Sequence, residues 1–392
     1  MKPKILCIAD YYLPGFKAGG AIRTIANMVS HLNKDFDFWI ITRDRDAYSS
    51  ESYHVSVNEW NNVDQAKVFY ASPGRFSFLG ILHLLNEIEH DILYLNSYFS
   101  IKATIYPLVA RYFRIYENAP IVIAPRGEFS AGALKLKALK KRLFITVANC
   151  VGLYRDVVWQ ASSEHEAQDI RNATTAISPH SIAVAPDCMP FSLGHCKVGG
   201  GEWISNGNAI RSIRIVYISR ISRKKNLHYL LCALKKVKSQ IKLSIYGPLE
   251  DIHYWTECKD LIDKLPINIK IEYKGLLTHD AIPNAFANHD VFFFPTMGEN
   301  YGHVIFESLA AGTCVVLSDQ TPWQHDVNGS VEIIGLENSD AWSEAIDRWA
   351  EYPSDVLLTR RNAAFQYINR YIADSKVVEK NRILFLDVLG LH

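Results

Sequence analysis

Hydrophobic residues in the first half of the chain fall into two kinds of pattern, which alternate. Short continuous runs of five to eight residues occur at "KILCI", "FDFWIIT", "KVFYAS", "DILYLNS", "PIVIAPRG" and "DVVWQAS". Stretches such as "AIRTIANMVSHL" instead repeat their apolar residues every three or four positions, which indicates a helix. Continuous runs between helices are typical of strands buried on both faces. This half therefore predicts a mostly parallel sheet with helices on both faces.

The same alternation restarts at residue 213. Its strand candidates are "IRIVYIS", "IKLSIYG", "IKIEYKG", "DVFFFPT" and "TCVVLS", and the helical stretches "DAWSEAIDRWAEY" and "DVLLTRRNAAFQYINRYI" close the chain. Between the two halves, a stretch rich in Gly, Pro, Ser and Asn interrupts the pattern. We predict an N-terminal domain at 1–186, a linker at 187–211, a C-terminal domain at 212–375 and a last helix at 376–392 that packs back on the N-terminal domain.

Two doubly wound, Rossmann-like domains of this kind are predicted to face each other across a cleft. Ligands of such sheets bind at the carboxyl ends of the strands. The loops that follow the strands are therefore where functional residues are expected.

Composition narrows the class of protein. The 392 residues are 48% hydrophobic and 21% charged, with a net charge of +1, which is ordinary for a soluble enzyme and gives no indication of nucleic-acid binding. The seven cysteines form no CxxC and no metal-ligand spacing, which predicts a reducing cytoplasm and no metal site. "MKPKILCIAD" lacks the long apolar core of a signal peptide, and no run of about 18 apolar residues predicts a transmembrane helix.

Two glutamates flank a predicted loop-to-helix turn in "GENYGHVIFESLAAG". Glu299 falls in the loop and Glu307 falls within the helix, four residues after His303. A carboxylate can accept hydrogen bonds from two neighbouring sugar hydroxyls, and the N–H groups near Gly302 and His303 can meet a phosphate. The spacing favours a ligand with a phosphate in the middle and hydroxyls at both ends.

A basic loop is predicted in "YISRISRKKNLHYLL". Arg220 follows a strand, and Lys225 precedes Asn226, the expected N-cap of the next helix. Arginine grips two oxygens and lysine acts as a point charge, so the pair suits a diphosphate. A basic turn on the surface is the alternative, and Arg223 and Lys224 are expected to be solvated.

Gly19 and Gly20 lie between the first strand and the first helix. They could let the backbone approach an anion, or they could form an ordinary turn. The pattern is not GxGxxG, and no acidic residue follows the second strand at the position typical of NAD binding. A nicotinamide dehydrogenase is therefore disfavoured.

Together these stretches resemble the GT-B glycosyltransferases, and the retaining family 4 in particular. "ENYGHVIFE" is similar to the family's E-x7-E motif, "SRISRKKNL" to its phosphate loop "GRLSPEKGL", and "GGAIRTI" to its Gly-Gly loop, while "IYGP", "YKGLL" and "VFFFPT" occur in the right order. "IVIAPRGEFSAGALKLKALKKRLF" resembles enzymes of bacterial surface-polysaccharide assembly. The resemblance implies sugar transfer from a nucleotide-diphosphate sugar, such as a UDP- or GDP-sugar, to a glycan or lipid-linked acceptor, in lipopolysaccharide O-antigen, capsule or exopolysaccharide synthesis.

The resemblance also implies roles for individual residues. Arg220 and Lys225 would bind the diphosphate, Glu307 would hold the ribose hydroxyls, and Glu299 would contact the transferred sugar. The other implied donor contacts are Gly19, Gly20, Gly247, Leu276, Leu277, Tyr301, Gly302 and His303. The family's histidine after the fourth strand is missing, since "YLNSYFS" has Asn96 and Ser97 there. Arg126 and Glu128 of "PRGEF" are candidate catalytic substitutes.

Two routes to transfer with retention of configuration at the sugar are open, through a covalent glycosyl-enzyme or by attack of the acceptor from the face that the phosphate leaves. The second route is favoured because no second carboxylate is securely placed. No cofactor or metal is expected to be required. The rivals are a GT-B sugar-nucleotide epimerase, a phosphorylase and a non-catalytic sugar-binding partner of an assembly complex.

A basic stretch near 134–144 has two interpretations. No acidic residue occurs between Phe129 and Tyr154, while lysines, one arginine and leucines interleave there. The stretch could lie on an anionic membrane, at the inner face of the plasma membrane, or be a solvated helix with its leucines in the core.

Overall fold

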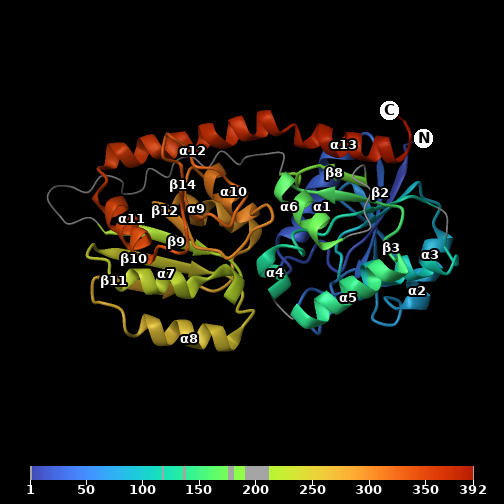
Figure 1. The fold of residues 1–392 in the computed structure, drawn as a ribbon, viewed down its shortest axis with the longest axis horizontal. Coiled ribbons are helices and arrows are strands. Elements are labelled where there is room, and N and C mark those ends of the chain that lie inside the picture. The colour runs from blue at the N-terminus through green and yellow to red at the C-terminus, as the bar shows by residue number, and fades with distance from the viewer. Residues whose placement is uncertain (1, 117–118, 136–137, 175–180, 190–211, 392) are drawn as a thin grey trace. The chain divides into compact units, whose positions relative to one another are not determined.

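The structure is a computed structural model, and it describes residues 2–116, 119–135, 138–174, 181–189 and 212–391 (Figure 1). The chain divides into two compact units. The first comprises Met1–Phe191 together with Ser375–His392, and the second comprises Ser192–Asp374.

The first unit is built on an eight-stranded sheet in the order β3-β4-β2-β1-β5-β6-β7-β8. All neighbouring strands pair in parallel except β3, which is antiparallel to β4. The strands are β1 Lys4–Ile8, β2 Asp37–Arg43, β3 Trp60–Val63, β4 Ala66–Ala71, β5 Ile92–Leu95, β6 Ile121–Ile123, β7 Val157–Ala161 and β8 Ile182–Val184.

Helices cover both faces of this sheet, because successive residues of the buried strands point to opposite sides. Leu6 and Ile8 of β1 belong to the core beneath α2, α3 and α6, whereas Ile5 and Cys7 belong to the core beneath α1 and α13. The helical segments are α1 Gly20–Leu32, α2 Phe78–Glu87, η1 Ile101–Ile105, α3 Tyr106–Tyr112, α4 Ala131–Lys135, α5 Ala138–Val151, α6 Glu164–Ala173 and α13 Val377–Val388. Phe385 of α13 packs edge-on against Phe36, which fixes the last helix on the first unit.

The second unit has a six-stranded, fully parallel sheet in the order β11-β10-β9-β12-β13-β14. The strands are β9 Ile213–Ile218, β10 Ile241–Tyr246, β11 Ile269–Tyr273, β12 Val291–Phe294, β13 Cys314–Ser318 and β14 Val331–Ile334. The helical segments are η3 Arg223–Lys225, α7 Leu227–Leu234, α8 Ile252–Ile262, η4 His279–Ala281, α9 Ile282–Ala287, α10 His303–Ala310, α11 Ser339–Glu351 and α12 Ser354–Ser375. The chain winds outward in one direction from β9 to β11 and in the other from β12 to β14, so the winding reverses between β9 and β12.

The prediction of two doubly wound α/β domains is confirmed. Three short strands, β3, β8 and β14, were not predicted from the sequence. The predicted linker at 187–211 lies mostly outside the described residues, and the predicted domain boundaries stay predictions. No helix in the described ranges is both long and apolar enough to cross a membrane.

Candidate functional site

An ion pair joins the two loops at which the winding of the second sheet reverses. Lys225 ends the short helix η3 in the loop after β9, and Glu299 lies in the loop after β12. The Lys225 ammonium donates to Oε1 of Glu299, and the two side chains are only 12% and 10% exposed. Ligands of doubly wound sheets bind at such a reversal, outside the carboxyl ends of the strands. The pair therefore sits where the fold favours a ligand.

One hydrogen bond between backbone groups and one from the Asn226 side chain hold these two loops together. The Met297 N–H donates to the Lys224 carbonyl at 2.8 Å, and the Asn226 amide donates to the Pro295 carbonyl at 2.9 Å. Asn226 is the N-cap of α7, as predicted, but it has a left-handed φ of 60° and its side chain makes no cap bond. Its side-chain amide instead attaches the loop after β9 to the end of β12, which fixes Lys225 relative to Glu299.

The charge on Glu299 is stabilised by its surroundings. Burial raises the pKa of this carboxyl, but Lys225, with Lys224 and Thr296, outweighs burial, so that the net pKa of Glu299 is lowered. The Thr296 hydroxyl also donates to Glu299 at 3.2 Å. The carboxylate is therefore ionised, preorganised and able to accept hydrogen bonds from a hydroxyl-bearing ligand.

Arg220 lies two residues after β9, as predicted, but it does not contact Lys225 or Glu299 and pairs with another carboxylate. Its Nη1 donates to Glu250 at 2.8 Å, and its side chain is 40% exposed. Arg223 pairs with Glu257 through Nη1 and Nη2 and is exposed. The structure thus brings Lys225 and Glu299 into contact, and it places Arg220 on the same loop with its guanidinium at the surface.

The turn before α10 requires glycine at one position. Gly302 is the N-cap with φ 82°, and a Cβ there would lie 2.8 Å from Cδ1 of Ile305. Tyr301 beside it is buried, and its carbonyl accepts a hydrogen bond from Nε1 of Trp323 at 2.7 Å. The turn is therefore fixed from both sides, with His303 half-buried at the first position of the helix.

Glu307 lies on α10 with a histidine as neighbour. Its Oε1 is 3.8 Å from Nδ1 of His279 in η4, and its side chain is 19% exposed. His279 and Trp323 were both missed from the sequence, since neither belongs to the motifs that were considered. Of the predicted base contacts in the loop after β11, Leu276 is exposed and Leu277 is half-buried.

Gly247 follows β10 and packs closely against the loop of Arg220. A Cβ at this position would lie 1.8 Å from the Ser219 carbonyl oxygen, and φ is 134°. The neighbouring Ile221 N–H donates to the Pro248 carbonyl at 2.8 Å. Glycine at 247 therefore lets the loops after β9 and β10 touch.

In the first unit, the predicted glycines lie at the start of α1. Gly19 is the N-cap with φ 75°, and no atom lies within 4 Å of the position where its Cβ would be. Gly20 is the first residue of the helix, which is 13 residues long. Both glycines are half-buried, and the space beside Cα of Gly19 is open.

Arg126 is held in a buried polar network of the first unit. Its Nε donates to Asn96 at 2.9 Å, while its two other nitrogens donate to Asp187 and to the Tyr94 hydroxyl. Burial opposes the charge, but Asp187 and its neighbours keep the pKa of Arg126 raised. The side chain is only 11% exposed, so this guanidinium is engaged within the protein.

Glu128 is likewise engaged by the loop after β5. Its carboxylate accepts hydrogen bonds from the Ser97 hydroxyl at 2.8 Å and from the backbone N–H groups of Tyr98 and Phe99. Burial raises the pKa of Glu128, and these hydrogen bonds oppose that rise. The geometry supports a role in positioning this loop, and the predicted catalytic roles of Arg126 and Glu128 stay predictions.

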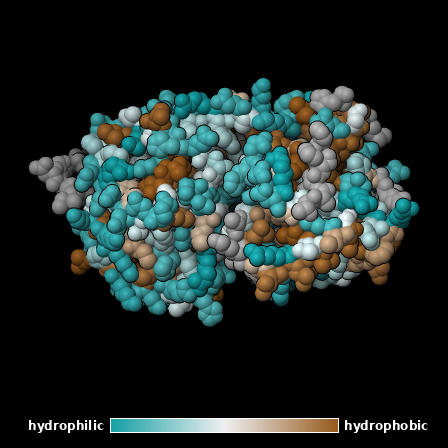
Figure 2. Space-filling view, viewed as in Figure 1, coloured by the Kyte–Doolittle hydropathy of each residue, from teal (hydrophilic) through white to brown (hydrophobic). Residues whose placement is uncertain are grey.

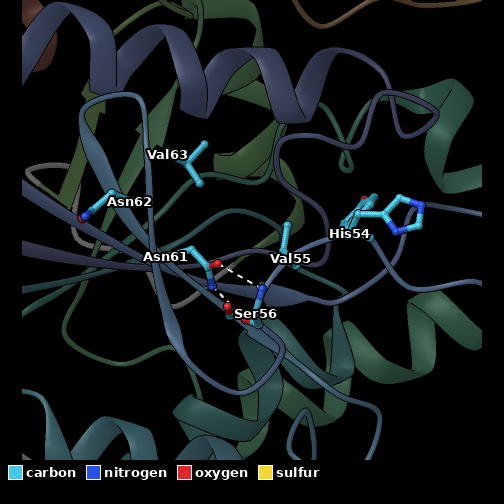
Figure 3. Close-up of a pocket in the computed structure, with 7 residues that line it drawn as sticks. His54, Val55, Ser56, Asn61, Asn62 and Val63 are labelled. Carbon is cyan, nitrogen blue, oxygen red and sulfur yellow. Dashed lines mark hydrogen bonds between the residues drawn. The ribbon is translucent and has the colours of Figure 1, made fainter.

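A pocket of about 680 Å³ lies elsewhere in the first unit, beside β3 (Figure 3). The lining residues are Tyr53, His54, Val55, Ser56, Asn61, Asn62 and Val63. The Asn61 side chain is bonded to the Ser56 backbone across it, donating to the carbonyl at 2.8 Å and accepting from the N–H at 3.2 Å. None of the predicted site residues lines this pocket. Within the described part of the chain, no group of three or more His, Cys, Asp or Glu side chains is arranged to hold a metal ion.

Comparison with known proteins finds a family model that resembles the second unit. Residues 205–365 match the family model described as Glycosyl transferases group 1. Most of the second unit is therefore similar to this family. This match supports the predicted enzyme class, a glycosyltransferase, and it includes the Lys225–Glu299 pair.

Two relatives are similar to this chain over only part of their own length. An uncharacterized glycosyltransferase of Methanocaldococcus jannaschii is 30% identical over 130 residues, 33% of this chain and 31% of that protein. A sulfoquinovosyl transferase of Arabidopsis thaliana is 27% identical over 114 residues, 29% of this chain and 20% of that protein. The chain thus spans a third or less of the length of these relatives.

Solved structures extend the likeness to both units. HepE from Anabaena, in complex with UDP-glucose, is similar with a TM-score of 0.70 and 17% identity, over 99% of this chain and 100% of that one. At this identity the likeness concerns the fold, and it confirms the predicted GT-B fold.

Proposed function

We propose that this protein is a glycosyltransferase that moves a sugar from a nucleotide-diphosphate sugar to a glycan or lipid-linked acceptor. The observation that carries the proposal is the buried Lys225–Glu299 pair at the reversal point of the sheet in a unit similar to the Glycosyl transferases group 1 family. The reaction proceeds with retention of configuration, in the cytoplasm, and serves bacterial lipopolysaccharide O-antigen, capsule or exopolysaccharide synthesis. The sequence resemblance supports these finer assignments.

The proposed donor uses the charges and dipoles at this edge of the sheet. Lys225 neutralises the diphosphate as a point charge, and the exposed Arg220 leaves Glu250 to add a second cation. The N–H groups at the start of α10 face anions favourably, because the helix dipole is positive there. HepE binds UDP-glucose, which makes UDP-sugars the first donors to test.

The two carboxylates bind the hydroxyl groups at the two ends of the donor. Glu299 contacts the transferred sugar, and Glu307 holds the ribose diol, with Leu276 and Leu277 against the base. This assignment agrees with the charge on Glu299, whose pKa is lowered beside Lys225 once burial is offset. Binding of a phosphate would compete with Glu299 for the Lys225 ammonium and so release the carboxylate toward the sugar.

Rate acceleration comes from stabilising the departing nucleoside diphosphate. Its charge grows in the transition state, so groups fixed in advance at that position lower the barrier most. Removing one such group typically costs about 3–4 kcal/mol, a hundred- to a thousandfold in rate. We favour attack by the acceptor from the face that the phosphate leaves, with a phosphate oxygen taking the proton; the buried Glu128 and Arg126 serve as positioning residues. Side-chain cations neutralise the diphosphate, so a metal is not required.

The test is a panel of UDP-, GDP- and ADP-sugars assayed for slow hydrolysis and, with glycan acceptors, for transfer. The wild-type protein is expected to release one nucleotide, and Glu299→Ala is expected to retain UDP binding while losing almost all turnover. Wild-type rates in Glu299→Ala would contradict the assignment. Nucleotide binding without any turnover in the wild type would point instead to a non-catalytic sugar-binding partner, and interconversion of the free sugar nucleotide would point to an epimerase.

A further inference from the structure

Helix α5 of the first unit has two apolar faces rather than one. Its inner face, with Phe144, Ile145 and Ala148, packs on the core of the sheet. A second row faces solvent, and its members are Leu139, Leu143, Val147 and Val151, exposed by 85%, 67%, 51% and 47%. Residues four apart share one side of a helix, so these four form a continuous stripe about 18 Å long. We call it the outer stripe of α5.

The outer stripe favours the membrane interpretation of the basic stretch. A solvated helix with its leucines in the core would bury Leu139 and Leu143, and both are exposed. Figure 2 shows hydrophobic side chains gathered on the surface where Figure 1 places α5. Scattered exposed apolar residues are ordinary, but a contiguous row marks an interaction surface.

Exposed aromatic residues extend this surface at one end. The guanidinium of Arg111 in α3 donates to the Asp156 carbonyl at 3.2 Å, which places the end of α3 beside the turn after α5. Tyr112 and Phe113 follow Arg111 and are 51% and 65% exposed. Aromatic side chains are favoured at the boundary between lipid and water.

The charges carried by α5 itself are of one sign. Lys140 and Arg142 are exposed beside it, and no acidic residue occurs on the helix. Lys141, in contrast, is fixed: its ammonium donates to the Ala133 carbonyl at 2.8 Å and lies 4.9 Å from the centre of the Phe99 ring. The helix is therefore anchored on its inner side and presents apolar and cationic groups outward.

We propose that the outer stripe of α5, with Lys140 and Arg142, docks the first unit on the surface of an anionic lipid bilayer. A row of aliphatic side chains on a helix whose only charges are cations complements acyl chains beneath anionic headgroups. The inference does not depend on the donor chemistry of the second unit, and it agrees with a lipid-linked acceptor.

Vesicle flotation tests the proposal with the full chain. Vesicles of phosphatidylcholine alone are compared with vesicles that also contain phosphatidylglycerol. The wild-type protein is expected to float with the anionic vesicles and not with the neutral ones. Binding should weaken at high salt, because the screening length falls from about 10 Å at 0.1 M to about 3 Å at 1 M.

Three double variants separate the contributions. Leu139→Gln with Leu143→Gln is expected to weaken binding roughly tenfold per leucine, and Lys140→Glu with Arg142→Glu at least roughly fivefold per residue. Ile267→Gln with Val327→Gln is the matched control, since these side chains of the second unit are 97% and 92% exposed. The control should bind as the wild type does, and all three should keep the wild-type melting temperature because the substituted side chains are exposed.

Three results would overturn the proposal. The first is a wild-type protein that stays in solution with anionic vesicles. The second is equal loss of binding in the control and in the leucine variant. The third is a dimer in solution that the leucine variant converts to a monomer while neither binds vesicles, which would make the outer stripe an interface between copies of the chain.

Discussion

Replacing Lys225 by methionine tests the electrostatics of the candidate site without any ligand. Methionine keeps most of the length of the side chain and removes the ammonium. Glu299 would then be an unpaired carboxylate with only 10% of its side chain exposed. Breaking a buried ion pair by removing one partner typically costs about 3–5 kcal/mol. For a unit of this size, that corresponds to a fall in melting temperature of roughly 6–20 °C.

The pH dependence of the loss gives a sharper test than its size. In the wild type, burial raises the pKa of Glu299, and Lys225 with its neighbours lowers it by more than burial raises it. The folded pKa therefore lies below the ordinary value of 4.5. Such a carboxylate contributes stability above its unfolded pKa, and the contribution is lost as the pH falls through the folded pKa. Without Lys225, burial dominates and the folded pKa of Glu299 moves upward, so the variant is penalised most at neutral pH.

The melting temperatures of wild type and Lys225→Met should therefore differ most near neutral pH and converge as the pH falls toward about 4.5. Differential scanning fluorimetry across this range measures both curves. Adding Glu299→Gln to Lys225→Met should restore much of the stability, since it removes the unpaired charge. A variant as stable as the wild type at neutral pH, or a gap that does not change with pH, would refute the reasoning.

Three further changes have expected outcomes. Gly302→Ala should lower stability by about 1–3 kcal/mol in chemical denaturation, because alanine must adopt φ 82° and meet Ile305, whereas Ala310→Gly in the same helix should cost at most about 1 kcal/mol. Trp323→Phe should lower the free energy of unfolding by about 1 kcal/mol, because the hydrogen bond to the Tyr301 carbonyl is lost. It should also weaken UDP binding in a thermal-shift titration, and unchanged UDP binding would show that Trp323 does not support the donor site. Arg126→Met should lower the melting temperature strongly because it removes the guanidinium that pairs with the buried Asp187, and an equal melting temperature would show that this ion pair contributes no stability.

Much of the candidate site was predictable because it depends on loops that follow buried strands. Runs such as "IRIVYIS" and "DVFFFPT" fix where β9 and β12 end, and Arg220, Lys225 and Glu299 follow directly. The contact between Lys225 and Glu299 was not predictable, since it depends on strand order: β9 and β12 are neighbours in the sheet but far apart in the chain.

Other features were not predictable from the sequence because they too depend on contacts between distant parts of the chain. Asn226 has the residue type of an N-cap, yet a contact with Pro295 from another loop determines its use. Trp323 lies outside the motifs and reaches Tyr301 only in the folded unit. Strand β3, "WNNV", has two asparagines and is stabilised by pairing with β4 rather than by its own pattern. Which leucines of α5 face the core was likewise a tertiary question.

The affinity for UDP of two variants from the same loop tests the central claim most directly. By isothermal titration, Lys225→Met should bind UDP at least about thirtyfold more weakly than the wild type, because a buried cation facing the diphosphate is lost. Arg223→Met removes an exposed cation two residues away that pairs with Glu257, and its affinity should stay within about fivefold. Equal affinities in the wild type and Lys225→Met, or a larger loss in Arg223→Met, would contradict a diphosphate site at the Lys225–Glu299 pair.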